Sequence, residues 1–206
     1  MIPYNGGKVM DREMNFEEVY REFQPKILHY ISRLASNDEA EDITQEVFEK
    51  IHRGLAGFEG KSKLSTWIYR IATNTALDRL RSPSFKRSTE ELTEASEDKN
   101  VWTSHKKAPV DQQLIRKEMS QCVQEHIDKL PSDYKTVILL SEHEGLTNKE
   151  IADILQVSLD TVKIRLHRAR ASLKKILDEA CDFYHNEQSI LACDRKSQFI
   201  KFRKTD

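Results

Sequence analysis

Apolar residues recur at every third or fourth position along most of this 206-residue chain, which is the spacing of one face of an α-helix. Such runs cover residues 16–34, 40–51, 64–75, 114–127 and 134–141. The chain holds only six glycines and five prolines, too few for a turn-rich β architecture. The sequence therefore predicts an all-α fold made of small helical domains.

Composition divides the chain into two helical domains and a linker. Residues 15–82 form the first predicted domain, with a helix break expected at Pro25 because proline lacks a backbone donor. Residues 83–109 mix acids and bases with serine and threonine and hold few large apolar side chains, so we expect a flexible linker. Residues 110–177 form the second predicted domain, and residues 178–206 form a C-terminal extension of unassigned role.

Charge and hydropathy exclude several classes of protein. The chain has 33 Lys and Arg residues against 34 Asp and Glu residues, so its net charge offers no general attraction to nucleic acid. No apolar run approaches the roughly 18 residues of a membrane span, and the N-terminus lacks an apolar signal core. Three cysteines are too few for a secreted disulfide framework. We expect a soluble cytoplasmic protein with no membrane insertion.

Residues 147–175 carry the most informative pattern, two capped helices joined by a tight turn. Thr147 and a glutamate three residues later form a predicted capping box, and Ser158 is placed to cap a second, longer helix. The second helix holds six Lys or Arg residues and one histidine, with no acid among them. A basic helix directly after a helix-turn is typical of docking in the DNA major groove. The alternative is a solvated basic face on a structural helix pair.

The first domain combines an acidic helix with a basic and aromatic segment. Residues 38–49 hold six acids, which indicates either a solvated face or a surface for a basic protein partner. Residues 58–81 instead interleave bases with Phe58, Trp67 and Tyr69, a composition suited to unpaired nucleic acid. The apolar spacing also places Trp67 on the packed face of its helix, which favours a core position.

Two segments resemble extracytoplasmic-function (ECF) sigma factors, in the order in which that family has them. Residues 42–48 and 58–74 are similar to sigma region 2, and residues 130–170 are similar to sigma region 4. The similarity covers both predicted domains. It implies a promoter-specificity subunit that directs bacterial RNA polymerase core to promoters and helps to melt them. It also implies that the chain is not an enzyme.

The resemblance assigns roles to three sets of residues. The positions that dock on the clamp helices of the largest polymerase subunit are Asp42, Gln45, Glu46 and Phe48. The positions that match minus-ten element opening and base capture are Phe58, Lys61, Ser62, Lys63, Trp67, Arg70 and Asn74. Base-facing positions for the minus-thirty-five element are Lys163, Ile164, His167 and Arg168, and phosphate contacts are Thr147, Asn148, Thr161, Arg165 and Arg170. The implied partners are RNA polymerase core, promoter DNA and, as an option, an anti-sigma protein; no cofactor is expected.

The C-terminal extension lies outside the resemblance and contains Cys181 and Cys193. A hairpin turn at residues 186–188 would place the two cysteines opposite each other, close enough to share a metal or to be oxidised together. A continued helix would instead bring Cys181 within one turn of His185. Neither arrangement supplies four ligands, so no zinc site is predicted and the two cysteines remain a candidate thiol or metal pair. Cys122 is expected in the core.

Two other functions fit parts of the sequence. A free-standing helix-turn-helix regulator would bind duplex DNA without polymerase, but it leaves the motifs of the first domain unexplained. A thiol-sensing or metal-sensing regulator would use the C-terminal extension and make DNA contact secondary.

Overall fold

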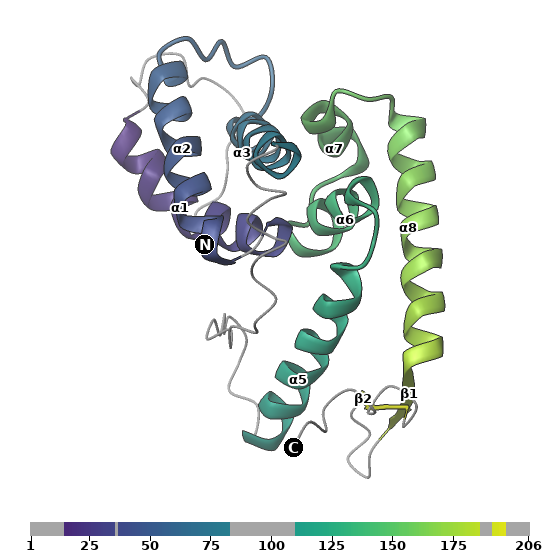
Figure 1. Cartoon of the computed structure of the whole chain (residues 1–206). Coiled ribbons are helices and arrows are strands. Elements are labelled where there is room, and N and C mark those ends of the chain that lie inside the picture. The colour runs from purple at the N-terminus through teal and green to yellow at the C-terminus, as the bar shows by residue number, and fades with distance from the viewer. Residues whose placement is uncertain (1–14, 36, 83–109, 186–190, 197–206) are drawn as a thin grey trace. The chain divides into compact units, whose positions relative to one another are not determined.

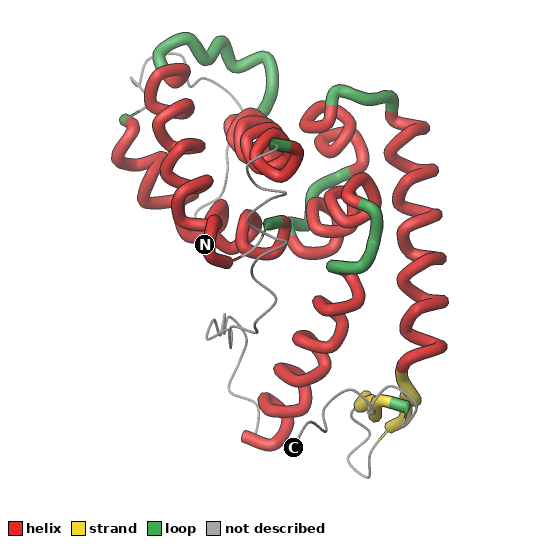
Figure 2. The backbone as a smooth tube through the Cα atoms, in the orientation of Figure 1, coloured by secondary structure: helices red, strands yellow, loops and turns green. Residues whose placement is uncertain are grey.

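The computed structural model describes residues 15–35, 37–82, 110–185 and 191–196 (Figure 1). The chain divides into two compact units, residues 1–85 and 86–206. The predicted linker 83–109 lies outside the described residues. Apart from one two-stranded hairpin, every regular element in the described ranges is a helix, so the all-α prediction is confirmed (Figure 2). None of the described helices is both long enough and apolar enough to cross a bilayer.

The first unit is a bundle of α1 (Phe16–Leu34), α2 (Asn37–Leu55) and α3 (Leu64–Arg81). Asn15 begins α1, because its side-chain oxygen accepts a hydrogen bond from the Glu17 amide at 2.9 Å. The inward positions predicted for α2 are all buried: Ala40, Ile43, Val47 and Ile51. These residues pack against the apolar faces of α1 and α3.

Pro25 lies inside α1, so the predicted helix break is wrong. Its ring removes one backbone donor, which leaves the Arg21 carbonyl without its usual partner. Pro25 and Arg21 are both exposed, so water can hydrate that carbonyl. Phe23 and Ile27, on either side of the proline, are buried. The packing of this apolar face holds the helix continuous, since tertiary burial contributes more to helix stability than local preference.

A buried hydrogen bond joins α1 to α3. The Tyr30 hydroxyl and Thr73 Oγ1 are 3.0 Å apart, and both side chains are fully buried. The ring of Tyr30 also meets the ring of Tyr69 edge-on, with centroids 5.5 Å apart. This pair fixes how the two helices lie against each other.

We expect Tyr30→Phe to lower the free energy of unfolding by about 1 kcal/mol, because it removes one buried hydrogen bond and keeps the ring. Urea titration followed by Trp67 fluorescence, in a Trp102→Phe background, measures this as a lower midpoint at constant slope. Tyr20→Phe is the matched control, since the Tyr20 side chain is 45% exposed. Equal midpoints for Tyr30→Phe and its parent would show that the hydroxyl pair adds no net stability.

The second unit contains α5 (Val110–Ile127), α6 (Ser132–Ile138), a π-helical turn η1 (Leu139–His143), α7 (Asn148–Leu155) and α8 (Leu159–Ala180). Val162, Leu166 and Ala169 form the buried face of α8. The helix packs on α5, α6 and α7. Helices α7 and α8, with the turn between them, form the predicted helix-turn-helix.

Both predicted caps of the helix-turn-helix are present. The Thr147 hydroxyl accepts from the Glu150 amide at 3.3 Å, and the Glu150 carboxylate accepts from the Thr147 amide at 2.9 Å. Ser158 accepts from the Thr161 amide at 3.1 Å. Gln156 closes α7 in the left-handed region with φ of 55°, a conformation that glycine adopts more easily.

Thr147→Ala should loosen α7, because it removes the side-chain half of the capping box. The expected loss is about 1 kcal/mol, which corresponds to about fivefold faster hydrogen exchange of the α7 amides that open locally. Thr147→Ser retains the hydroxyl and should exchange at close to the wild-type rate. Unchanged exchange in the alanine variant would mean that tertiary packing alone fixes the start of α7.

The C-terminal extension forms an antiparallel hairpin of β1 (Cys181–His185) and β2 (Leu191–Arg195). A continued α8 is therefore wrong, since the backbone at Cys181 is extended. The hairpin is confirmed, but the predicted pairing of Cys181 with Cys193 is wrong: Cys181 faces Arg195, and Phe183 faces Cys193. The connection spans residues 186–190 and is two residues longer than predicted, which shifts the register by two.

Candidate polymerase and DNA interfaces

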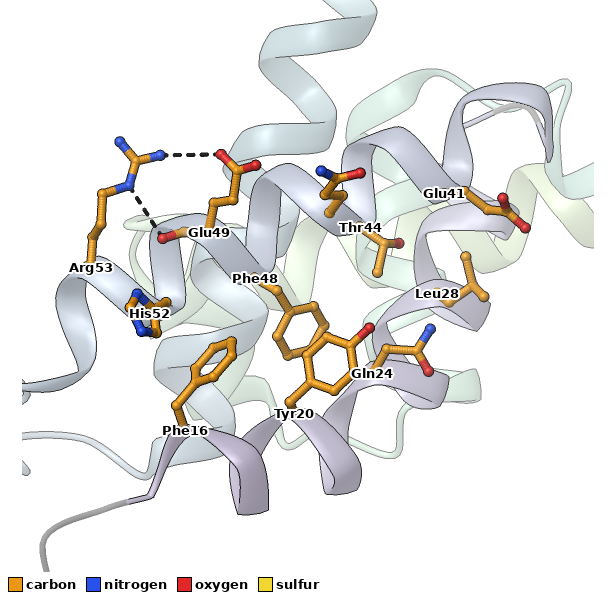
Figure 3. Close-up of a pocket in the computed structure, with 11 residues that line it drawn as sticks. Phe16, Tyr20, Gln24, Leu28, Glu41, Thr44, Phe48, Glu49, His52 and Arg53 are labelled. Carbon is orange, nitrogen blue, oxygen red and sulfur yellow. Dashed lines mark hydrogen bonds and ion pairs between the residues drawn. The ribbon is translucent and has the colours of Figure 1, made fainter.

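Helices α1 and α2 border an open groove with a volume of about 780 Å³ (Figure 3). Aromatic side chains line one part of it. The Tyr20 and Phe48 rings meet edge-on with centroids 4.8 Å apart, and the Phe16 and His52 rings do so at 4.7 Å. Tyr20 remains 45% exposed, which leaves an apolar surface open to solvent.

Polar side chains of α2 border this aromatic surface. Glu41, Gln45 and Glu49 line the groove and are exposed, and Glu49 pairs with Arg53 at 3.5 Å. The rim is therefore mainly acidic and polar beside an aromatic floor. Such a surface suits a basic partner that also carries apolar side chains.

The four residues predicted to bind core polymerase all lie on α2, but only two of them line the groove. Gln45 is exposed there, whereas Phe48 is 4% exposed and belongs to the floor. Asp42 is exposed but does not line the groove, and half-buried Glu46 pairs with Lys50 at 2.8 Å.

The groove residues Phe16, Tyr20 and His52 have no role predicted from the sequence. Phe16 and Tyr20 are one helical turn apart, a spacing that predicts a packed apolar face, but the Tyr20 side chain is 45% exposed.

The residues predicted to contact the minus-ten element lie in the loop before α3 and along α3 itself. Lys61 and Lys63 are exposed in the loop, and Lys61 pairs with Glu59. Phe58 packs on Trp67 with ring centroids 5.2 Å apart, so the loop folds back on the start of α3. Trp67 is half-buried, which leaves part of its ring accessible.

Trp67, Arg70 and Asn74 follow one another at helical spacing and lie on one face of α3. Asn74 is exposed and Arg70 is half-buried. The Arg70 Nε is buried, and in the described part of the chain it has no hydrogen-bond partner. Ser62 is half-buried just before the helix, so the predicted minus-ten residues lie partly in the loop and partly on α3.

Helix α8 presents a row of exposed side chains opposite its buried face. Lys163, Ile164, His167 and Arg168 are all exposed, and Ile164 is 51% exposed although it is apolar. This row is the predicted base-facing set. Its spacing of three and four residues places the side chains where an inserted helix would meet base edges.

Several predicted phosphate contacts already have partners inside the second unit. Arg165 pairs with Asp133 at 2.8 Å, and Arg170 pairs with Glu142 at 2.6 Å. The hydrogen bond from Arg170 lowers the pKa of Glu142. The Thr147 hydroxyl is part of the capping box, and Thr161 hydrogen-bonds with Ser158. Asn148 is the first residue of α7 and is half-buried. These residues brace the helix-turn-helix. The base-facing row is exposed, and within it Lys163 pairs with the exposed Asp160 at 3.4 Å.

Comparison with known proteins places both units in one family. Residues 19–85 match sigma-70 region 2, and residues 120–173 match sigma-70 region 4. The chain is 36% identical to the ECF RNA polymerase sigma factor SigW of Bacillus subtilis, over 79% of this chain and 88% of SigW. It is 35% identical to the RNA polymerase sigma-H factor of Pseudomonas aeruginosa, over 79% of this chain and 86% of that protein.

A solved structure shares the fold at lower identity. The sigma factor RpoE of Bartonella quintana, solved with the anti-sigma factor NepR, superposes with a TM-score of 0.60 at 22% identity. The match covers 79% of this chain and 96% of RpoE. Two matched sigma regions in order, and relatives above 30% identity over most of their length, establish the family. The chain belongs to the extracytoplasmic-function sigma factors, the promoter-specificity subunits of bacterial RNA polymerase.

Proposed function

We propose that the first unit binds core polymerase and the minus-ten element, and that the second unit reads the minus-thirty-five element. The observation that carries this division is that each unit has its own surface of distinct chemistry. The first unit has the acidic and aromatic groove and the Phe58–Trp67 surface, and the second unit has the exposed row on α8.

The groove between α1 and α2 is proposed as the site for the polymerase clamp helices. A helix laid along it would bury Tyr20 and the exposed part of Phe16, while its basic residues would meet Asp42, Glu41 and Glu49. Phe48 then acts as a fixed floor rather than as an anchor that enters the partner, because it is already buried.

The loop before α3 is proposed to hold unpaired bases of the minus-ten element. Unstacking a base costs a few kcal/mol, so a site that captures it needs an aromatic or shaped surface and nearby cations. The Phe58–Trp67 pair supplies the aromatic surface, and Lys61 and Lys63 supply charge for the phosphates. Asn74, one further turn along α3 beyond Arg70, is placed to hydrogen-bond a base edge.

The exposed row on α8 is proposed to enter the major groove at the minus-thirty-five element. Lys163 and Arg168 are donors suited to guanine edges, and Ile164 offers an apolar contact for a thymine methyl group. Arg165 and Arg170 can contact phosphates only if they share or give up their ion pairs with Asp133 and Glu142. Their contribution to DNA affinity should therefore be smaller than that of an unpaired arginine.

In this proposal the chain is a non-enzymatic factor that acts beside polymerase in the cytoplasm. Its regulation is proposed to use an anti-sigma protein that covers the groove or the α8 row. Such a protein would compete directly with polymerase or promoter DNA, because both surfaces are exposed in the free chain.

Transcription in vitro tests the proposal. Purified chain is added to bacterial core polymerase on a library of promoter fragments, and transcripts are compared with reactions that lack it. Chain-dependent transcripts that share two spaced upstream elements support the division of roles. Duplex binding by the isolated chain without any chain-dependent transcript would contradict it. A pull-down of core by the chain tests the groove separately from the DNA contacts.

A further inference from the structure

All three cysteines of the chain and one buried histidine gather where the hairpin joins the second unit. Cys122 and His126 lie one turn apart on α5, and Cys181 directly follows α8. One ligand atom from each of these three residues lies within 4.8 Å of the other two, and all three residues are buried. The Cys122 and Cys181 sulfurs are 3.9 Å apart.

Cys193, on β2, lies next to this three-residue cluster and is the candidate for a fourth ligand. It packs against the buried cluster of Cys122, Ala180 and Cys181, and the Cys181 thiol influences the pKa of Cys193. The register explains why: Cys193 faces Phe183, so it lies two residues from Cys181 on the same face of the hairpin. The cluster therefore joins α5, the end of α8 and both strands.

His126 has an unused ligand atom in this cluster. Its side chain is 7% exposed, and within the described ranges its Nδ1 has no hydrogen-bond partner. Burial, with a smaller contribution from Lys129, lowers the pKa of His126. A neutral imidazole is the form that binds metal, and a buried nitrogen without a partner costs free energy that a bound ion would recover.

We propose that Cys122, His126, Cys181 and Cys193 form a tetrahedral Zn²⁺ site. A Zn–S distance of about 2.3 Å separates two sulfurs of a regular tetrahedron by about 3.8 Å. The Cys122 and Cys181 sulfurs are already at that separation. Three thiolates and one imidazole form a common structural zinc set, and soft sulfur ligands disfavour Mg²⁺ and Ca²⁺.

The surroundings fit the charge of such a site. Three thiolates and Zn²⁺ leave one net negative charge, and Arg195 lies beside Cys122 while it pairs with Glu125 at 2.8 Å. Burial and the neighbouring thiols raise the pKa of Cys181 to about 12. Zinc would displace the thiol protons, which leave to solvent.

The site would fasten the C-terminal end of the recognition helix. α8 carries the proposed base-facing row and runs straight into β1, as Figure 1 shows. Metal bound between Cys181 and the α5 ligands ties that end of α8 to α5. In the sequence, Cys181 and Cys193 alone supply too few ligands for zinc. Cys122 and His126, which lie one helical turn apart on α5, supply the other two.

Cobalt titration of the reduced, metal-free full chain tests the site. We expect one equivalent of Co²⁺ to give a thiolate-to-cobalt charge-transfer band and tetrahedral d–d bands, and Zn²⁺ to bleach them. Cys122→Ser and Cys181→Ser should each weaken binding by about tenfold or more. Cys193→Ser should lower the charge-transfer absorbance by about one third, because one of the three thiolate ligands is lost. His185→Ala is the matched control, since His185 is exposed on the same hairpin and should bind as wild type.

A second measurement uses only the wild-type chain. Zn²⁺ should protect all three thiols from alkylation and raise the melting temperature, and a chelator should reverse both effects. Absence of a cobalt–thiolate spectrum from the reduced chain would overturn the proposal. So would wild-type cobalt affinity in Cys122→Ser, or a stable Cys122–Cys181 disulfide, found by intact mass, in protein kept under cytosolic reducing conditions.

Discussion

Asp42→Lys combined with Gln45→Lys should lower affinity for core polymerase by roughly a hundredfold. Both side chains are exposed on α2, and Gln45 lines the groove proposed to receive the clamp helices. Placing two cations against a basic partner replaces attraction with like-charge repulsion, which costs on the order of 3 kcal/mol. Competition between variant and wild type for a limiting amount of core, read by native gel, measures the change.

Glu22→Lys is the matched control for that double variant. Glu22 is an exposed acid on α1 that pairs with Lys26 and does not line the groove. Its reversal changes net charge in the same direction but should alter core affinity by less than about threefold, since surface ion pairs contribute little. If Glu22→Lys and the double variant lose the same affinity for core polymerase, the loss comes from overall charge. That result would contradict the proposal that the groove binds the clamp helices. Helix content by circular dichroism should match wild type in both.

Local signals in the sequence predicted the parts of this fold that depend on local chemistry. Thr147 and Ser158 cap their helices because a short polar side chain can accept a hydrogen bond from a free amide three residues further along. This contact does not depend on the tertiary fold. One face of α2 is buried because its apolar residues recur at helical spacing, at Ala40, Ile43, Val47 and Ile51. The row on α8 was predictable for the same reason.

Long-range packing decided the features that the sequence did not predict. Pro25 stays inside α1 because Phe23 and Ile27 are buried on both sides of it. The hairpin register depends on the length of a connection that no local signal fixes, so Cys181 and Cys193 are diagonal rather than opposite. The approach of Cys122 to Cys181 joins residues far apart in the chain.

The same contrast applies to the functional surfaces. A helical motif shows which positions can face outward, but it does not show which outward positions have intramolecular partners. Arg165 and Arg168 are both arginines and lie three residues apart, yet Arg165 pairs with Asp133 while Arg168 is exposed. The packing of α8 on α6 is what distinguishes Arg165, which pairs inside the unit, from Arg168, which is exposed. This distinction is what makes Arg168 the sharper residue to test.

Arg168→Ala should reduce transcription from a minus-thirty-five-dependent promoter by about 5–150-fold. The reason is the loss of about 1–3 kcal/mol of base contact in the major groove. Quantitative transcription by holoenzyme at subsaturating promoter measures it. Lys175→Ala is the control, because Lys175 is an exposed base two turns further along α8 that pairs with Glu179. Lys175 belongs to neither predicted DNA-contact set, so its substitution should have a small effect and should leave base preference unchanged.

A double-mutant cycle separates base contact from general charge in the Arg168 result. Each base pair of the minus-thirty-five element is replaced in turn, and wild-type and Arg168→Ala holoenzymes are compared on every template. If Arg168 reads a base, one replacement costs the wild type about 1–3 kcal/mol and costs the variant almost nothing, because the contact is already absent. If Arg168 contacts only phosphate, the variant is weaker by the same factor on all templates. That uniform loss would contradict the base-facing role of Arg168 while leaving α8 as the DNA-contacting helix.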